Sequence, residues 1–411
     1  MTHKTFSEQT NIVRKDVLIV FIILLNAFAW NFMTPIMIDS VLSSLNITNA
    51  QNLIIWIAYY AAIIGSSIIG AVLSKMISRL TFLYLWIILG VFASLLLIPL
   101  SNFTVTYILV VSILLGVSFG LGMPSCLAYF ADCTFVENRG RMGGIILLIT
   151  NLVAALFAIP FLMFNLMANS IIFVAWRGAG LIIFFLKPKE KFVSETRRNV
   201  SFASIFKDKS FIFYFIAWLM FCLVDRSGKP IIDYASGAFY SLILIIGPII
   251  GSFSALFGGL LSDWVGRKRI VLYGFILLGI AYAVIGIVPT ASFSWYFYLV
   301  VGSVGTGMLW VIFILVLWGD LSQSGNREKY YVIGGIPYFL TGVIRLLVTP
   351  YVMLIPETSA FSLASFFLFL AVLPLLYAPE TLPEKKIRLR RLRGYMEAAK
   401  KVKEKYTKKE R

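Results

Sequence analysis

The sequence predicts an all-α membrane protein of twelve transmembrane helices, arranged as two six-helix, pseudo-symmetric halves. Hydrophobic residues make up 60% of the 411 residues and charged residues only 13%, about half the charge of a typical soluble protein. The chain also repeats itself at an offset of 188 residues, which places Arg79 on Arg267 and Asp132 on Asp320. Two parallel copies of such a unit are typical of a transporter that rocks around a central site.

Twelve apolar runs are the expected helices, because each is close to the roughly 20 residues that a helix needs to cross a bilayer. Taken in order, the boundaries after even-numbered runs carry Lys or Arg, and those after odd-numbered runs carry Asn, Ser or Pro. The expected spans are 17–38, 52–74, 80–100, 104–131, 141–164, 168–186, 211–232, 237–261, 270–289, 293–318, 331–355 and 359–378. They divide the chain into a first half (1–186), a basic linker (187–210), a second half (211–384) and a basic tail (385–411).

The distribution of Lys and Arg predicts the orientation of the chain. Of its 36 basic residues, all fall in the tails and in the loops after even-numbered helices except Arg177, Arg226, Lys229 and Arg345. By the positive-inside rule that face and both termini are cytoplasmic, and we expect a multi-pass protein of the cytoplasmic membrane. The net charge of +17 therefore points to anionic lipid rather than to nucleic acid as the neighbour of the basic residues.

The basic tail over 385–411 has apolar residues at helical spacing and thirteen basic residues against three Glu. Two interpretations stay open. The tail can lie as an amphipathic helix on the anionic inner leaflet, or it can be solvated and partly frayed.

The cytoplasmic loops resemble those of the major facilitator superfamily and, within it, of the sugar porters. Residues 259–269 read GLLSDWVGRKR, similar to the family's Gly-x-x-x-Asp-Arg-x-Gly-Arg-Arg loop with Trp264 in place of the first Arg. The fourth and tenth helices end in an Asp with an Arg seven residues further on, and the twelfth ends in Pro-Glu-Thr over 379–381. The resemblance covers about residues 15 to 385 and implies a twelve-helix transporter that works without a cofactor.

The chain departs from this pattern at several positions. In the first copy of the loop, Ala71, Lys75 and Ser78 stand where Gly, Asp and Gly are expected. The sixth helix lacks the subgroup's Pro-Glu-Ser ending, and the tenth lacks its Gly-Pro-x-x-x-Trp element. These departures bear on the first-half gate and on the choice of a sugar as solute.

Charged residues at the inner helix ends form an expected cytoplasmic gate. Asp132 is placed to pair with Arg79 or Arg139, and Asp320 with Arg267 or Arg327. Such pairs hold the inner mouth shut and must part when the cavity opens inward, a switch between two packings. The alternative is that these charges only set orientation. The expected gate residues are Arg79, Asp132, Arg139, Asp263, Arg267, Asp320 and Arg327.

Ionisable residues inside the spans mark a pathway or a partner. The seventh helix carries Asp225, Arg226 and Lys229, in a stretch that resembles the sugar porters' Gln-x-Ser/Thr-Gly element. We expect Asp225 and Lys229 to pair on one face, and Gly228 and Pro230 to break the helix and expose backbone groups to a cavity. The alternative is an ion pair that only joins helices.

Arg345 is expected near the middle of the eleventh helix, where it needs a carboxylate such as Asp225 or Asp39, or an anionic solute. The only histidine is His3 in the N-terminal tail, so a transported proton must be carried by a carboxylate. Asp225 is the first candidate for this role and Asp39, at the outer end of the first helix, the second.

Amide, indole and phenol groups on the helices expected to line the cavity suit recognition of hydroxyl groups. Any one of them can instead join helices by hydrogen bonds. The expected substrate-binding residues are Trp30, Asn31, Asn151, Asp225, Arg226, Lys229, Trp310, Tyr338 and Arg345.

We therefore expect a monomeric secondary transporter, not an enzyme, that carries a small polar organic solute such as a sugar or polyol by alternating access and couples its transport to protons. A small carboxylate metabolite is the alternative solute, favoured by Arg226, Lys229 and Arg345. A receptor that binds solute without transporting it is the alternative of another class. No metal-ligand cluster, ATP-binding loop or nucleophile–base set is found in the sequence.

Overall fold

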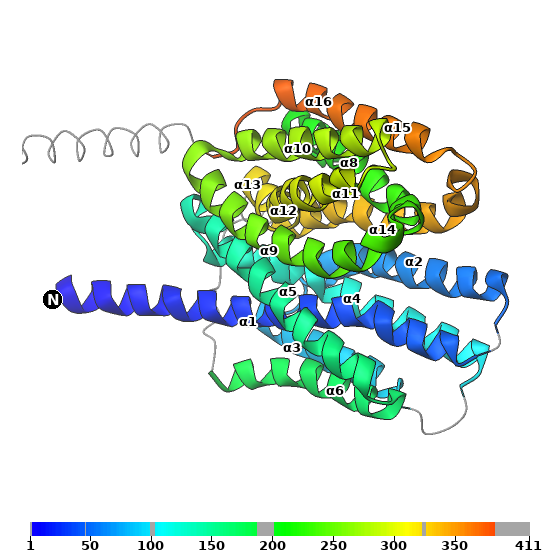
Figure 1. The fold of residues 1–411 in the computed structure, drawn as a ribbon. Coiled ribbons are helices and arrows are strands. Elements are labelled where there is room, and N and C mark those ends of the chain that lie inside the picture. The colour runs from blue at the N-terminus through cyan, green and yellow to red at the C-terminus, as the bar shows by residue number, and fades with distance from the viewer. Residues whose placement is uncertain (1, 46, 99–102, 187–200, 323–325, 383–411) are drawn as a thin grey trace, which may run out of the picture.

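The structure is a computed structural model that describes residues 2–45, 47–98, 103–186, 201–322 and 326–382 (Figure 1). In this part of the chain every regular element is helical. The first half contains α1 (Thr2–Ser43), α2 (Asn49–Leu73), α3 (Arg79–Leu95), α4 (Val105–Cys133), η1 (Val136–Asn138), α5 (Arg139–Met163), α6 (Leu166–Ala179) and η2 (Gly180–Leu186). The second contains α7 (Phe202–Ile205), α8 (Lys209–Ala235), η3 (Gly237–Phe239), α9 (Tyr240–Val265), α10 (Arg267–Ile287), α11 (Ser292–Phe297), η4 (Tyr298–Gly302), α12 (Ser303–Trp310), η5 (Val311–Val316), α13 (Leu317–Leu321), α14 (Arg327–Val352), α15 (Glu357–Leu370) and α16 (Val372–Tyr377).

Eleven spans among the described residues are long and apolar enough to cross a membrane, and α3 is a shorter apolar helix. Segments α11 to α13 run on as one span, Ser292–Leu321, and α15 with α16 form another, Glu357–Tyr377. Large apolar side chains on the outside of the bundle are exposed, as the lipid-facing surface of a membrane protein requires. The predicted all-α fold is confirmed, and the eleven spans together with α3 correspond to the twelve expected helices.

The halves lie side by side, with α1 to α6 below and α8 to α16 above in Figure 1. The surface between them is called the seam. It is built mainly where α2 packs against α14 and α5 packs against α9. Any pathway between the halves must therefore run between these two helix pairs.

Two boundaries differ from the prediction. Helix α1 begins at Thr2, well before the expected start at residue 17. Helix α8 runs without interruption from Lys209 to Ala235, so the expected break at Gly228 and Pro230 is wrong. Proline removes one backbone donor, and a packed membrane helix absorbs that loss without ending.

The junction between α9 and α10 is fixed by a glycine and a carboxylate. Gly266 has φ +109°, a conformation that residues with a Cβ rarely adopt. The carboxylate of Glu380 then accepts hydrogen bonds from the backbone N–H groups of Arg267 at 2.8 Å and Lys268 at 3.2 Å. An acidic group at a helix N-terminus satisfies free donors and favours the helix dipole. The Pro-Glu-Thr ending thus orients the start of α10.

Arg177 on α6 lies fully buried inside the first half. Its guanidinium carbon is 4.8 Å from the ring centroid of Trp30 on α1 and 4.5 Å from that of Trp86 on α3. Its Nη1 donates to Asn26 Oδ1 at 3.0 Å. One cation therefore joins three helices through cation–π contacts and a hydrogen bond.

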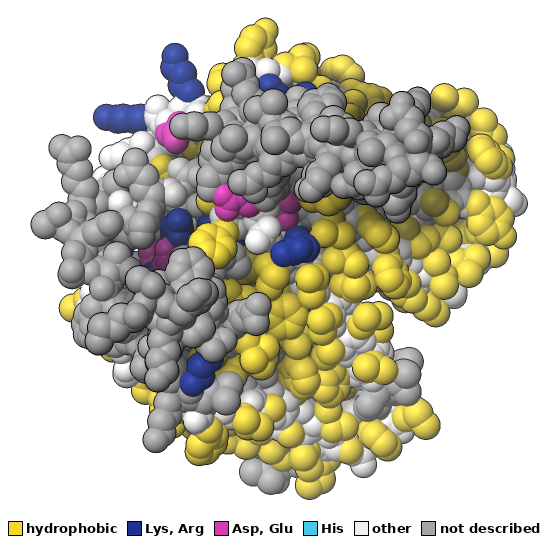
Figure 2. Space-filling model, turned by 90° about the vertical axis from the view of Figure 1, so that its left-hand side faces the viewer, with side chains coloured by type: hydrophobic (Ala, Val, Ile, Leu, Met, Phe, Trp, Pro, Cys, Tyr) yellow, Lys and Arg dark blue, Asp and Glu magenta, His cyan; other side chains and the backbone are white. Residues whose placement is uncertain are grey.

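The face that carries Arg79, Arg139, Arg267 and Arg327 is called the basic face. Figure 2 looks onto it and shows acidic and basic side chains gathered near the middle, among apolar ones. Much of the predicted linker (187–200) and the whole predicted tail (385–411) lie outside the described residues, as do the expected tail helix and its lipid contact.

Candidate functional site: two ion-pair clusters and a central cavity

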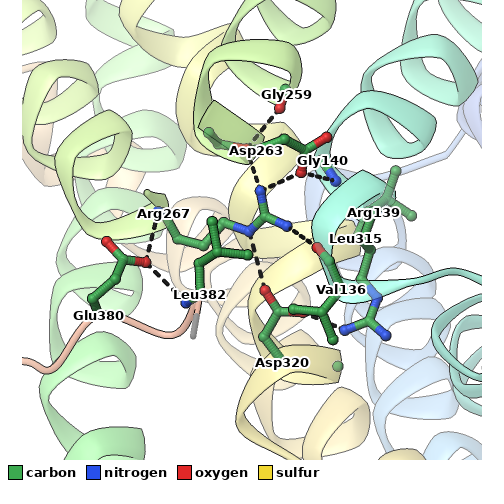
Figure 3. Close-up of polar contacts among 12 residues, drawn as sticks. Val136, Arg139, Gly140, Gly259, Asp263, Arg267, Leu315, Asp320, Glu380 and Leu382 are labelled. Atoms are coloured by element: carbon green, nitrogen blue, oxygen red, sulfur yellow. Dashed lines mark hydrogen bonds and ion pairs between the residues drawn. The ribbon is translucent and has the colours of Figure 1, made fainter. Parts of the chain in front are cut away.

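The Arg267 cluster is a buried group of ion pairs on the basic face, formed by Arg139, Asp263, Arg267 and Asp320. Arg267 Nη1 donates to Asp263 Oδ1 at 2.5 Å, and its Nε donates to Asp320 Oδ2 at 3.1 Å (Figure 3). The four side chains are at most 5% exposed. Charge-assisted hydrogen bonds in so dry a place are strong, and removing one partner is costly.

Arg139, at the start of α5, crosses the seam within this cluster. Its Nη1 pairs with Asp320 Oδ1 in the second half. Within its own half, Nη2 donates to the carbonyl of Ala131 at 2.6 Å and Nε donates to Thr134 Oγ1 at 3.2 Å. Arg139 is thus anchored to the first half and reaches one carboxylate of the second.

Asp263 makes a second link across the seam, to the backbone of α5. Its two carboxylate oxygens accept from the N–H groups of Gly140 at 3.0 Å and Arg141 at 2.8 Å. Helix α9 can approach α5 this closely because position 140 is a glycine. A Cβ there would collide with the carbonyl oxygen of Gly259. The carboxylate lies at a helix N-terminus, where the dipole favours negative charge.

The Arg79 cluster lies beside it and contains Arg79, Asp132, Arg327 and Glu328. Arg79 Nη1 donates to Asp132 Oδ2 at 2.6 Å, and its Nη2 donates to Glu328 Oε1 at 2.7 Å. Arg327 Nη1 pairs with Asp132 Oδ1. The side chains of Arg79, Asp132 and Arg327 are 15 to 20% exposed, so this cluster is wetter than the Arg267 cluster.

The pairing differs from the order expected from the chain. Asp132 pairs with Arg79, as one of the expected alternatives had it, but its second partner is Arg327 of the other half. The Arg139 alternative for Asp132 is wrong, because Arg139 instead pairs with Asp320. The repeat therefore exchanges its arginines across the seam, so each cluster contains side chains of both halves.

A cavity of about 90 Å³ lies in the seam. Trp318 and Tyr331, which line one end of it, are within about one helical turn of the two clusters. The wall is mostly apolar and rich in aromatic rings, among them Phe28, Phe32, Phe119, Trp310, Tyr338 and Phe339. Asn31 and Ser67 are polar members of the lining. This wall can surround an apolar group but offers few partners to a solute with many hydroxyl groups.

Several polar atoms of the wall are already used within the protein. The Trp218 indole donates to the carbonyl of Gly334 at 2.7 Å, and the Tyr331 hydroxyl donates to the carbonyl of Leu315 at 2.7 Å. The indole Nε1 of Trp310, in contrast, is buried and has no hydrogen-bond partner among the described residues. It remains as a donor that a bound solute can satisfy.

An irregular stretch of the tenth span follows Trp310, the last residue of α12. The π-helical segment η5 begins directly after it and presents Phe313 and Ile314 to the cavity. Each π-helical turn holds an extra residue, which shifts the direction of the side chains that follow, and such segments are common at functional sites. The tenth span therefore places its aromatic rings without the Gly-Pro element of the sugar porters.

The charged residues of α8 lie further from the basic face than the cavity. Trp218 lines the cavity, and Arg226 follows eight residues later, about 12 Å along the helix. The guanidinium carbon of Arg226 lies 4.0 Å from the ring centroid of Tyr338, which lines the cavity on the other side. Arg226 Nε is buried and has no hydrogen-bond partner among the described residues. Arg226 is thus a cation one residue behind the cavity wall.

Asp225 has no ion pair within 4 Å among the described residues, so the expected pair with Lys229 is not formed. Its charged neighbours at longer range are Arg226, Lys229 and Arg345. Asp39, which is exposed, interacts at longer range with Arg345. Arg345 lies 18 residues into α14, about 27 Å from its start, so it is near the face opposite the basic face rather than in mid-span.

Besides the charged residues Asp225, Arg226, Lys229 and Arg345, two uncharged residues expected to bind substrate do not line the cavity. Trp30 is fully buried in the first half, where its indole donates to Ser94 Oγ at 2.9 Å and its ring stacks on Phe173. Asn151 donates to Ser252 Oγ at 2.7 Å across the seam and does not line the cavity. Both residues therefore join helices by hydrogen bonds, which is the alternative interpretation given above.

The sequence interpretation placed Trp310 and Tyr338 at the site, and both line the cavity, but it missed Glu328 and the other aromatic residues of the lining. Glu328 follows Arg327 directly, and its pairing with Arg79, 249 residues away, depends on how the halves dock. The aromatic residues occur singly on several helices, where they look like ordinary packing residues. The available signal was the loss of Asp at position 75, which left Arg79 without a carboxylate one turn before it.

Comparison with known proteins identifies the fold. Neither protein-family models nor curated protein sequences match this chain. Among solved structures, the major facilitator superfamily transporter FucP in its outward conformation is similar, with a TM-score of 0.72, 13% identity and coverage of 88% of this chain and 98% of that one. The chain has the fold of these transporters.

Two further structures give the same result. The E. coli fucose:proton symporter FucP, in a variant form, matches with a TM-score of 0.71, 13% identity and the same coverage of both chains. The human organic anion transporter MFSD10 matches with a TM-score of 0.67 and 14% identity over 88% of this chain and 99% of that one. The spans and the fold together make the chain a multi-pass membrane protein. The narrower resemblance to sugar porters stays a prediction.

Proposed function

We propose that this chain is a secondary transporter that carries a small organic anion with an apolar body through the seam by alternating access. The observation that carries the proposal is the cavity, whose wall is mostly apolar and aromatic. An apolar body gains about 25 cal/mol for each Å² removed from water there. A sugar would instead leave hydroxyl groups unpaired, which costs about 1–3 kcal/mol for each group.

The anionic part of the solute is assigned to the Arg226 side of the cavity. Arg226 has no carboxylate at ion-pair distance among the described residues, and one of its nitrogens has no partner. A buried cation in a membrane protein needs a counter-charge. Tyr338 separates Arg226 from the cavity, so we propose that its ring moves aside when a carboxylate or sulfonate enters.

The two ion-pair clusters are the proposed gate. They join the halves on the basic face through Arg139–Asp320, Arg327–Asp132 and Arg79–Glu328. We propose that the formed clusters close the cavity toward that face, and that this face is cytoplasmic, as are both termini. Opening toward the cytoplasm requires the clusters to part while the halves rock as bodies.

Proton coupling is part of the proposal and is assigned to Asp225. This carboxylate lies beside Arg226, the proposed anion partner. A solute that occupies Arg226 changes the electrostatic surroundings of Asp225, and by linkage the bound proton and the bound anion then affect each other. Asp39 is the second candidate, through its neighbour Arg345.

The first test is a thermal-shift screen of the purified protein with benzoate, hexanoate, fucose and mannitol at two pH values. A ligand at 100 times its Kd stabilises the native state by about 2.7 kcal/mol. We expect the two apolar anions to raise the melting temperature and the two polyhydroxy compounds to leave it unchanged. Uptake of labelled toluenesulfonate, which does not cross lipid by itself, into proteoliposomes with and without a pH gradient then tests transport. Binding without uptake would favour the receptor alternative.

A sugar or polyol carried with protons is the second candidate function. It is supported by the likeness of the fold to the fucose:proton symporter and by Asn31, which lines the cavity. Stabilisation by fucose but not by benzoate would favour this candidate over the organic anion.

A further inference from the structure

Two positions of the internal repeat carry residues of different charge in the two halves. The second half has Asp263 where the first has Lys75, and it has Glu328 where the first has Gly140. The other charged members of the two clusters keep their residue type at the offset of 188. Compared with the Arg267 cluster, the Arg79 cluster therefore lacks a carboxylate at position 75 and has an additional one at position 328.

In the Arg267 cluster the second carboxylate comes from the same half as the arginine. Asp263 binds Arg267 and also the backbone N–H of Gly140 across the seam. A side chain at position 140 would collide with the Asp263 carboxylate and with the backbone of Gly259. A carboxylate at position 263 therefore requires a glycine opposite it.

In the Arg79 cluster the second carboxylate comes from the other half. Arg79 Nη2 donates to Glu328 Oε1 at 2.7 Å, and the Glu328 side chain is 4% exposed. Glu328 lies in the first turn of α14, where negative charge is favourable. Lys75 stands one turn before Arg79, so the local loop supplies a like charge instead of a carboxylate.

We propose that Glu328 is the second gate carboxylate of the first half, supplied from across the seam. It acts as a positioning residue that holds Arg79 against the second half while the basic face is closed. The inference rests on the proposed function, because it assumes that the clusters open during alternating access. It adds that two ion pairs cross the seam in the Arg79 cluster, Arg79–Glu328 and Arg327–Asp132, against one in the Arg267 cluster, Arg139–Asp320.

The test measures access to the cavity from the basic face and needs no solute. Ser67 lines the cavity and is changed to cysteine in a chain whose three native cysteines are replaced by serine. An impermeant maleimide is added to inside-out vesicles, and the rate of labelling is recorded. We expect Glu328→Gly to raise this rate about tenfold, because a nearly buried ion pair across the seam is lost.

The decisive variant is the double change Lys75→Asp with Glu328→Gly. It restores the arrangement of the Arg267 cluster, with a carboxylate one turn before Arg79 and a glycine opposite it. We expect its labelling rate to return to within about twofold of the parent. Asp208→Asn is the matched control, because it removes a carboxylate of the same face that caps α8, and Asn caps a helix equally well.

The outcomes separate this inference from the proposed function. Asp320→Asn serves as the positive control for opening. An increase for Asp320→Asn without one for Glu328→Gly would overturn the inference and leave the gate in place. If Glu328→Gly raises the labelling rate and the double variant fails to lower it again, Glu328 does not replace a carboxylate at position 75, and the inference is refuted. No increase in any gate variant would overturn alternating access itself, and the inference with it.

Discussion

Replacing Asp320 by asparagine removes the carboxylate that two buried arginines share. Asp320 pairs with Arg139 across the seam and with Arg267 in its own half, and all three side chains are at most 1% exposed. Asparagine keeps the shape and one acceptor oxygen but loses the charge. The variant should therefore fold and yet hold the basic face closed less firmly.

The magnitude depends on which contacts differ between the closed and open states. Of the two Asp320 pairs only the one with Arg139 crosses the seam, and Arg267 also pairs with Asp263 within its own half. A hydrogen bond to a charged group contributes about 1.5–3 kcal/mol, and each 1.4 kcal/mol is a factor of about ten in population. We expect the share of molecules open to the basic face to rise by about 10- to 100-fold.

The assay is maleimide labelling at Ser67→Cys from the basic face, with the same labelling from the opposite face as its counterpart. The first rate should rise and the second should fall if the halves rock as bodies. A melting temperature close to that of the parent would establish that the variant is folded. Rates from both faces within twofold of the parent would refute the assignment of Asp320 to the gate.

The remaining predictions concern the cavity and the seam. Arg226→Gln should weaken binding of an apolar anion by about 10- to 100-fold in a thermal-shift titration, because a charged partner is lost, whereas Lys229→Gln, which changes an exposed cation, should weaken it less than threefold. Asp225→Asn should abolish accumulation driven by a pH gradient but keep exchange of labelled for unlabelled solute, and full accumulation would exclude Asp225 as the proton carrier. Trp310→Phe should lower affinity by about 1 kcal/mol, while an unchanged affinity would mean that the indole N–H does not meet the solute. Gly140→Ala should push α5 away from α9 and raise labelling from the basic face, and a normal rate would show that the close contact is not needed for closure.

The fold could be predicted because its signals are local and repeated. Each span is a continuous apolar run, and the offset of 188 residues aligns the charged ends of four helices in each copy. Helix ends were harder to place, as the continuous α8 shows. Whether Pro230 ends a helix depends on the packing around it, which the local sequence does not contain.

The clusters could be predicted in composition but only in part in their pairing. Arg79, Asp132, Arg267 and Asp320 meet within their own halves as the spacing suggests. The partners Arg327 and Glu328 come from the other half, and their contacts depend on how the two bundles dock. The apolar character of the cavity was missed for the same reason, because rings spread over several helices form one wall only after docking.

The burial of Arg177 bears on how the first half moves. A guanidinium held between the rings of Trp30 and Trp86 ties α6, α1 and α3 into one stiff block. A six-helix half can move as one body only if its helices keep their relative positions. Helix α6 lies on the far side of this block from the seam in Figure 1. If the halves rock as proposed, α6 can therefore rotate together with α1, which lines the cavity.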